Sequence, residues 1–148
     1  MQSITYRPIG SVRSPHSEPA NTPKQTESAR GSAGRVEVLP EYADGLKDLD
    51  EFSYLWLLVY FDRADARPLR VSTARDEPPH GIFATRAPVR PNPIGLSLVR
   101  LVRIEGCTLY IEDLDLLDET PVLDIKPYVP ALDDRAAERI GWFARRLH

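Results

Sequence analysis

Residues 53–61 read SYLWLLVYF, a run of aromatic and aliphatic side chains that is almost without polar members. An apolar stretch of this length, rich in β-branched and aromatic residues, predicts a strand and not a surface helix. We expect this strand to be buried on both faces or to cross a dimer interface. The rest of the chain is divided by prolines and glycines into similar short apolar runs, so the strand belongs to a sheet.

We expect about seven strands, little helix and no regular alternation of strand and helix. This pattern favours a mainly β fold, a small antiparallel β-barrel with long loops and a C-terminal helix, over a doubly wound α/β fold. Besides residues 53–61, strands are expected at residues 4–12, 36–39, 69–72, 81–85, 94–104, 108–117 and 122–125.

The longest expected strand, residues 94–104, has imperfect alternation. Arg100 and Arg103 would fall on opposite faces of a regular strand, so we expect a bulge or a sharp twist between them. Gly106 is expected to form the turn that follows. A helical turn is expected at residues 42–49.

Residues 133–147 are expected to form the C-terminal helix, with Asp133 as its N-cap. Its apolar stripe would consist of Ala136, Ile140, Phe143 and Leu147. Residues 15–34 are polar and rich in Pro, Ser and Gly, which is typical of a long functional or disordered loop.

Size and composition indicate a single domain spanning residues 1–148, large enough to need no disulfide or metal for its stability. The start of the chain lacks a signal-peptide pattern, and no apolar run approaches the ~20 residues of a membrane span, so we expect a cytoplasmic protein without a membrane contact. The net charge of −3 does not indicate a general nucleic-acid binder, and any RNA contact would come from a local patch. Cys107 is expected to be a small buried apolar residue, and no Cys or His spacing suggests zinc.

Two segments contain the candidate chemistry. The first is TRAPVRPNPIGLSLV, residues 85–99, whose prolines shape the backbone in advance. Arg86, Arg90 and Asn92 suit an anionic or planar polar ligand, and Gly95 allows close approach of the backbone. The alternative is a rigid turn that enters a strand with its arginines in solvent.

The second segment is DLLDETPVLDIKPY, residues 115–128. Its carboxylates could receive ribose hydroxyls or positive groups of a ligand. If the chain is extended, Asp124, Lys126 and Tyr128 share one strand face and could serve proton transfer. The alternatives are a solvated acidic loop with an Asp124–Lys126 ion pair, or a divalent metal site, although no acid spacing matches a known metal loop. The crowded acids are Asp115, Asp118, Glu119 and Asp124.

Together, the two segments resemble the signature of the TrmO family, also called YaeB-like or VirR-like, over roughly residues 81–128. The family pattern is TR-[SA]-P-x-RPNPIG-x-S followed by DLLDGTPVLDIKPY. The resemblance implies a β-barrel methyltransferase that acts as a homodimer and uses S-adenosylmethionine. We expect no bound metal. It implies N6 methylation of threonylcarbamoyladenosine next to the anticodon of tRNA.

The resemblance also implies roles for individual residues. It leaves Arg90 and Asn92 as candidates for the substrate side, and Asp124, Lys126 and Tyr128 as candidates for catalysis. The implied cofactor contacts are Pro23, Lys24, Gln25, Phe61, Asp62, Arg86, Leu96, Asp118, Glu119, Thr120 and Pro121.

Three features depart from the family pattern. Glu119 stands where members have Gly, and Asp62 stands where members often have His. The chain also ends where longer bacterial members continue into a segment that helps to bind tRNA. The helix expected here would either present a solvated face or contact RNA through Arg135, Arg139, Arg145 and Arg146.

Other functions remain open at this point. The same segments could bind S-adenosylmethionine or a nucleotide without catalysis, or methylate a different RNA or a small molecule. A metal-dependent hydrolase built on the acidic segment is a further alternative.

Overall fold

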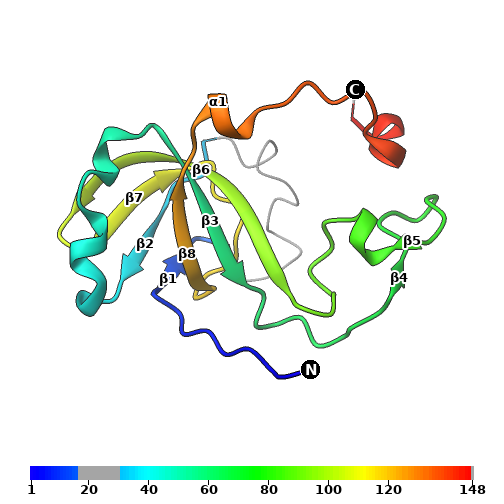
Figure 1. Ribbon diagram of the computed structural model, residues 1–148, viewed down its shortest axis with the longest axis horizontal. Helices are drawn as coiled ribbons and strands as arrows, with labels where there is room; N and C mark the ends of the chain where they lie inside the picture. Colours follow the sequence, from blue (N-terminus) through cyan, green and yellow to red (C-terminus); the bar gives the residue numbers. More distant parts are fainter. Residues whose placement is uncertain (17–30, 148) are drawn as a thin grey trace.

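Six antiparallel strands form a closed barrel in the computed structural model, which describes residues 1–16 and 31–147. The strands follow one another around the barrel in the order β1-β2-β7-β6-β3-β8 (Figure 1). The expected antiparallel β-barrel is therefore confirmed. Its strands are β1 Gly10–Arg13, β2 Gly34–Val38, β3 Tyr54–Tyr60, β6 Ile94–Glu105, β7 Thr108–Glu112 and β8 Pro121–Pro127.

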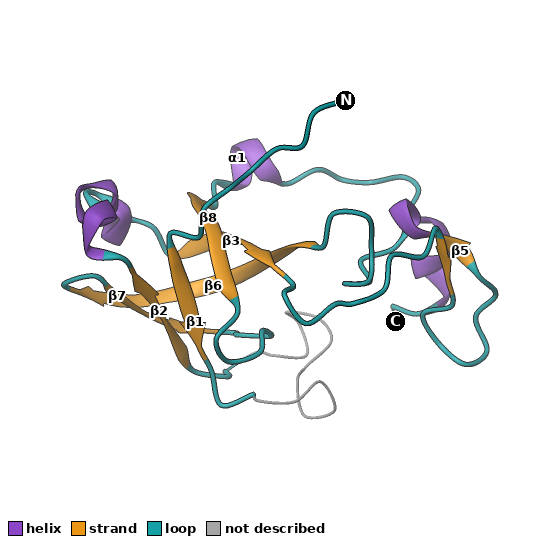
Figure 2. Cartoon of the chain, turned by 90° about the horizontal axis from the view of Figure 1, so that it is seen from below, coloured by secondary structure: helices purple, strands orange, loops and turns teal. Residues whose placement is uncertain are grey.

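A second, two-stranded sheet stands to one side of the barrel (Figures 1 and 2). It pairs β4, Arg70–Val71, with β5, His80–Gly81, and the short 3-10 helix η5, Ile82–Ala84, follows. We call residues 62–92, which leave the barrel after β3 and return to it at β6, the arm. The remaining helices are η3 Pro40–Leu46, η4 Leu49–Glu51, α1 Pro130–Asp133 and η6 Gly141–Arg145. None of the described helices has the length and apolar character needed to cross a membrane.

Strand β3 explains how the sequence builds the core. Leu55, Leu57 and Val59 point into the barrel and are completely buried, whereas Trp56 and Leu58 between them are half-buried on the outer face. The expectation that this strand is buried on both faces is therefore wrong for the part of the single chain that the structure describes, where the apolar side chains of its outer face have no covering layer. That it crosses a dimer interface stays a prediction.

The irregularity expected in the longest strand is confirmed. The pairing of β6 with β7 shifts register between Leu101 and Arg103, so Val102 is the extra residue of a bulge. The bulge breaks the alternation and leaves both Arg100 and Arg103 exposed. Gly106, with a φ of 61°, forms the turn between the two strands as expected.

Two expected strands are shorter in the structure. The first begins only at Gly10, and Ile4 and Tyr6 before it are exposed and unpaired with any described strand. Strand β7 ends at Glu112 because Asp113 adopts a left-handed conformation, with a φ of 65°. The run at residues 81–85 is mostly the helix η5 and not a strand.

The C-terminal helix expected at residues 133–147 is wrong. Asp133 ends the four-residue helix α1 instead of capping a later one, and its Oδ2 accepts a hydrogen bond from the backbone of Val129 at 2.8 Å. Further along, Gly141 has a φ of 60° and begins the separate helix η6. Ile140 and Leu147 are exposed, so the apolar stripe has no surface against which a continuous helix could pack.

Candidate functional site

The acidic segment makes a tight turn before β8. Thr120 donates to the carbonyl of Leu117 from its backbone nitrogen, at 3.3 Å, and from its hydroxyl, at 2.8 Å. Glu119 has a φ of 68°, while Asp118 is not in the positive-φ region. This is the pattern of a type II turn, whose third residue is ordinarily glycine. The turn therefore keeps the glycine-type backbone even though a glutamate occupies it.

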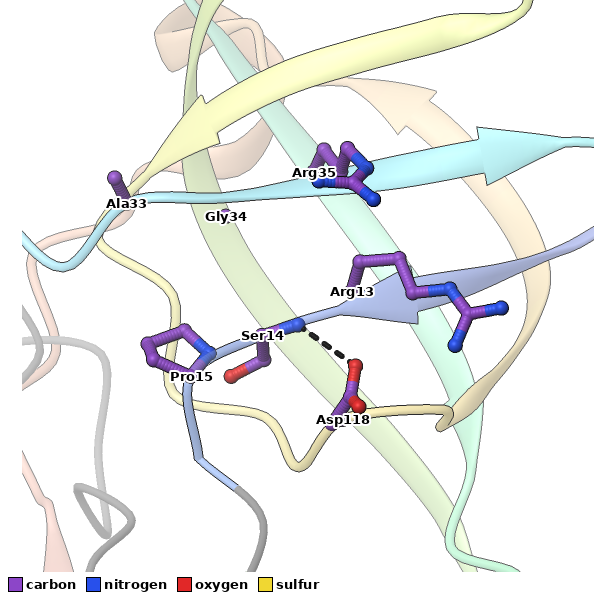
Figure 3. Close-up of a pocket in the computed structure, with 7 residues that line it drawn as sticks. All are labelled: Arg13, Ser14, Pro15, Ala33, Gly34, Arg35 and Asp118. Atoms are coloured by element: carbon purple, nitrogen blue, oxygen red, sulfur yellow. Dashed lines mark hydrogen bonds between the residues drawn. The ribbon is translucent and has the colours of Figure 1, made fainter.

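This acidic turn is attached to the chain that leaves β1. An Oδ1 atom of Asp118 accepts a hydrogen bond from the backbone of Ser14 at 3.0 Å (Figure 3). The backbone of Asp118 donates to the carbonyl of His16 at 2.7 Å, and that of Glu119 donates to Val12 at 2.8 Å. Beside these contacts lies an open hollow of about 360 Å³, lined by Arg13, Ser14, Pro15, Ala33, Gly34, Arg35 and Asp118.

The hollow is mixed in charge. The guanidinium groups of Arg13 and Arg35 bond Glu37 at 3.2 and 3.0 Å, and Arg13 also lies 3.3 Å from a carboxylate oxygen of Glu119. The bonds from Arg35 and then Arg13 hold the pKa of Glu37 below its usual value. An anionic ligand would therefore compete with glutamates for these arginines.

Two further segments meet the acidic turn at the same end of the barrel. Arg63, just after β3, donates to the carbonyl of Asp118. The backbone of Phe61 donates to Pro93 at 2.8 Å, and its ring lies against Gly95 at the start of β6. We call residues 61–63, 93–97 and 115–120 the barrel-end junction.

A buried polar contact joins the two signature segments at this junction. Ser97 has almost no exposure to solvent, and its hydroxyl donates to an Oδ1 atom of Asp115. The contact places the start of the acidic segment directly over strand β6. Six of the implied cofactor residues lie in the junction, and Pro121 lies at its edge, at the start of β8. The six are Phe61, Asp62, Leu96, Asp118, Glu119 and Thr120.

The proline-rich loop is held by one of its own arginines. The Arg90 guanidinium donates to the carbonyls of Thr85 and Ala87 at 2.9 and 3.1 Å. Arg86 and Asn92 are exposed, and their side chains form no hydrogen bond or ion pair with the described residues. Arg90 therefore shapes the loop, which leaves Arg86 and Asn92 as its accessible polar side chains.

The three candidate catalytic residues do share one face. Asp124 and Lys126 lie opposite Leu58 and Trp56 on the outer side of β8, with Lys126 Nζ 3.1 Å from Asp124 Oδ2. The ring of Tyr128 packs edge-on against Trp56, with ring centroids 5.8 Å apart.

This face is remote from the acidic turn within one chain. Strand β8 starts at Pro121 and runs away from the turn, and at about 3.3 Å per residue Tyr128 lies roughly 20 Å along it. The structure therefore does not bring Lys126 and Tyr128 to the barrel-end junction of the same chain. Pro23, Lys24 and Gln25 lie outside the described residues. Within residues 1–16 and 31–147, no cluster of His, Cys, Asp or Glu is arranged to hold a metal ion.

One charged cluster was not foreseen from the sequence. Glu77, in the arm, is buried and accepts hydrogen bonds from His80 and from the guanidinium groups of Arg145 and Arg146. The indole of Trp142 stacks on His80, with ring centroids 5.1 Å apart, and donates to the carbonyl of Ala84 at 2.8 Å. We call Glu77, His80, Trp142, Arg145 and Arg146 the Glu77 cluster.

The Glu77 cluster attaches the C-terminal residues to the arm. Bonding to His80, and then to Arg146 and Arg145, lowers the pKa of Glu77 to about 2 against the cost of burial, so its carboxylate is ionised near neutral pH. Arg145 and Arg146 are thus engaged in ion pairs, in place of the solvated helix face that the sequence suggested. The partners are separated by nearly seventy positions in sequence, so no local pattern could have paired them.

Replacing Glu119 with glycine should stabilise the protein by about 0.5–1 kcal/mol. A side chain in the left-handed region costs about 1–2 kcal/mol, which the added flexibility of glycine only partly offsets. The exposed ion pair with Arg13 contributes little. Thermal unfolding of Glu119→Gly should show the gain. The matched control, Glu119→Ala, loses the same ion pair but keeps a Cβ and should show no gain; equal melting of the two variants would contradict the assignment.

Comparison with known proteins relates this chain to one protein family. The sequence pattern described as the tRNA-methyltransferase O N-terminal domain matches residues 11–134. A probable S-adenosyl-L-methionine-binding protein of Pyrococcus abyssi is 52% identical over 98% of this chain and 79% of its own length. The tRNA (adenine(37)-N6)-methyltransferase of Escherichia coli K12 is 39% identical over 88% of this chain and 60% of its own length.

The same relationship holds for solved structures. The crystal structure of TrmO from Pseudomonas aeruginosa superimposes with a TM-score of 0.80 at 41% identity, covering 96% of this chain. This chain spans only 62% of that protein. The likeness therefore extends to the whole barrel and arm, but not to the whole of the longer relatives.

Proposed function

Because the chain belongs to the tRNA-methyltransferase O family, we propose that it transfers a methyl group from S-adenosylmethionine to RNA. We propose as its acceptor the N6 nitrogen of threonylcarbamoyladenosine next to the anticodon of tRNA, and a cytoplasmic homodimer as its working form. The observation that carries the proposal is the barrel-end junction, where segments far apart in sequence meet at one end of the barrel.

The residues of the junction fit the proposed cofactor. Asp118 and Glu119 provide carboxylates next to backbone groups that are already shaped by the type II turn. A carboxylate can accept hydrogen bonds from ribose hydroxyls and attract a sulfonium charge. Phe61, whose ring lies against Gly95 in the same junction, provides an aromatic surface of the kind that an adenine or a thioether prefers.

The cofactor, when bound, supplies an electrophilic methyl group for in-line displacement. The protein's contribution is to align the acceptor nitrogen with that methyl group. Correct positioning can lower the activation free energy by about 7–11 kcal/mol. The acceptor nitrogen carries a proton, which a base must remove. We propose that Asp124 or Tyr128, with Lys126 beside them, takes that proton.

The position of these three residues supports a site shared between two copies. In one chain Lys126 and Tyr128 lie at the far end of β8 from the acidic turn, and Asp124 lies midway along the strand. These residues would approach a barrel-end junction only if the β8 face of one copy packed against the junction of the other. The exposed apolar side chains of Ile94 and Leu96, next to the half-buried outer face of β3, are the surface that such a contact would cover.

Asp124→Asn and Tyr128→Phe should each lower turnover by about 10²-fold or more while leaving the affinity for S-adenosylmethionine unchanged. Turnover is measured as methyl transfer to tRNA, and affinity by calorimetry. Mixing Asp124→Asn with a junction variant such as Phe61→Leu should restore activity, because a mixed dimer with shared sites has one intact site. Wild-type turnover in both single variants would remove these residues from the mechanism.

The proposed reaction is tested with bulk tRNA from a strain that lacks this protein. Labelled S-adenosylmethionine should transfer its methyl group, and mass spectrometry of the nucleosides should find it on threonylcarbamoyladenosine. Transfer to another nucleoside would replace the acceptor. Cofactor binding without any transfer would favour a binding module, and survival of the activity in EDTA would exclude a metal-dependent hydrolase.

A further inference from the structure

The arm differs in charge from the rest of the molecule. Residues 62–92 contain six arginines against four acidic residues, a net charge of +2 in a chain whose total is −3. The arm stands clear of the barrel on one side (Figures 1 and 2). A local basic element on an acidic protein is where a polyanion would be held.

The side chains of three of these six arginines form no polar contact within the described part of the chain. Arg67 and Arg90 donate to backbone carbonyls within the arm, and Arg63 donates to the carbonyl of Asp118 in the acidic turn. The side chains of the other three are exposed and form no hydrogen bond or ion pair with the described part of the chain. These unpaired arginines are Arg70, Arg75 and Arg86.

The arm also contains an exposed aromatic ring. Phe83 is 78% exposed, although Ile82 beside it is buried and its backbone bonds Leu69 at 2.9 Å. Leu69 precedes Arg70, so the ring and this guanidinium come from adjoining segments. A phenylalanine that is left in solvent contributes almost nothing to the stability of the fold.

We infer that the arm is an RNA-binding element, in which a base of single-stranded RNA stacks on Phe83 while Arg70 and Arg75 contact phosphates. The inference rests on the proposed RNA substrate and assigns it a surface. Unpaired RNA loops are recognised by stacking on aromatic rings combined with arginine contacts, and the arm has both. A second copy of this chain is less suited to the arm, because each arm would bring its net positive charge toward a like surface.

The Glu77 cluster keeps this element in place. The tail contact from Trp142 reaches the carbonyl of Ala84, immediately after Phe83, and the ion pairs of Glu77 hold the loop between β4 and β5. The ring and the arginines are therefore presented on an ordered support, which lowers the entropic cost of binding.

The test measures binding of a fluorescein-labelled anticodon stem-loop RNA by anisotropy at several salt concentrations. Phe83→Ala should weaken binding about tenfold or more. Arg70→Gln and Arg75→Gln should each reduce the slope of log K against log salt by about 0.7–0.9. The matched controls are Leu132→Ala, which removes another exposed apolar side chain, and Lys47→Gln, which removes an exposed cation near η3 and η4 at the opposite end of the molecule (Figure 1). Both should bind as the wild type does.

The results distinguish RNA binding by the arm from contact between copies and from failure of the proposed methyl transfer. Unchanged RNA affinity and salt slope in all three arm variants would overturn the inference, and a change confined to the sedimentation of Phe83→Ala would instead assign the arm to contact between copies. The variants replace exposed side chains, so unchanged melting and unchanged calorimetric binding of S-adenosylmethionine verify their folding. If the wild type binds RNA through Phe83 but transfers no methyl group to tRNA, the proposed function fails while the RNA surface stands.

Discussion

Gly10→Ala should destabilise the barrel by about 3 kcal/mol or more, because a Cβ at this position has no space. It would lie 3.0 Å from the Cα of Val38 and 3.1 Å from the carbonyl carbon of Glu37, and closer still to the carbonyl oxygen of Glu37. All three are backbone atoms of the paired strand β2, which cannot rotate away as a side chain can. The strands themselves must separate.

Separation at this position opens the barrel. Gly10 pairs with Val38 of β2 and with Val122 of β8, and β1 is the only described strand that joins these two. Its pairing with β8 is short and includes only Gly10 and Ser11. A loss of about 3 kcal/mol corresponds to a fall of roughly 6–12 °C in the melting temperature of a domain of this size, measured by circular dichroism.

Gly45→Ala is the matched control for this prediction. Gly45 lies in η3, where an added Cβ meets nothing within 4 Å and φ is not positive. Its substitution should be neutral or stabilise by about 0.5 kcal/mol through the unfolded state. Similar melting temperatures for the two variants would show that the close approach of β1 to β2 does not limit the fold.

Gly95→Ala should impair cofactor binding more than it impairs stability. Its Cβ would lie 2.7 Å from Cε2 of Phe61 and 2.8 Å from Cγ2 of Val59, and closer to Cζ of Phe61. These are side-chain atoms, so the ring of Phe61 can move aside at a cost of about 1–3 kcal/mol. The ring would then leave its place in the barrel-end junction, and we expect S-adenosylmethionine to bind at least tenfold more weakly.

A double variant separates this steric effect from a general loss of stability. Phe61→Leu removes the atoms with which the alanine collides, so Gly95→Ala should cost less in that background than in the wild type, with a coupling of about 1 kcal/mol in unfolding. Calorimetry with S-adenosylmethionine and denaturant titrations measure the two quantities. Additive effects on both would show that Phe61 and Gly95 act independently.

The barrel could be predicted from the sequence because the residues of its core strands form recognisable local patterns. Leu55, Leu57 and Val59 have no polar neighbours in sequence, and the failure of alternation around Arg100 and Arg103 correctly indicated a bulge. These patterns arise because side chains alternate between the two faces of a strand, and this alternation, or its interruption at a bulge, is visible in the sequence itself.

Where the sequence misled, contacts distant along the chain decided the structure. The apolar spacing of the tail suggested a helix, but Gly141 interrupts it and Trp142 finds its partner near Ala84 in the arm. Nothing near Glu77 in sequence shows that Arg145 and Arg146 form ion pairs with its carboxylate. Helical propensity is a weak determinant when tertiary contacts compete with it.

The candidate site could be predicted only in part, because contacts between residues distant along the chain also determine it. Resemblance to a family suggested Phe61, Asp118 and Thr120 as cofactor contacts, which stays a prediction, and the strand register places them at one end of the barrel. The same register placed Tyr128 at the far end of β8, a separation that alternation along a strand could not reveal. Sharing a strand face indicates direction but not distance from a ligand.

The most direct test of the barrel-end junction is the change of backbone amide chemical shifts when S-adenosylhomocysteine, the product form of the cofactor, is added to the 15N-labelled protein. The largest changes should fall on residues 61–63, 94–97 and 115–120. Changes confined to the outer faces of β1, β2 and β7, with none at Phe61, Leu96 or Asp118, would contradict the assignment of the cofactor to this end of the barrel.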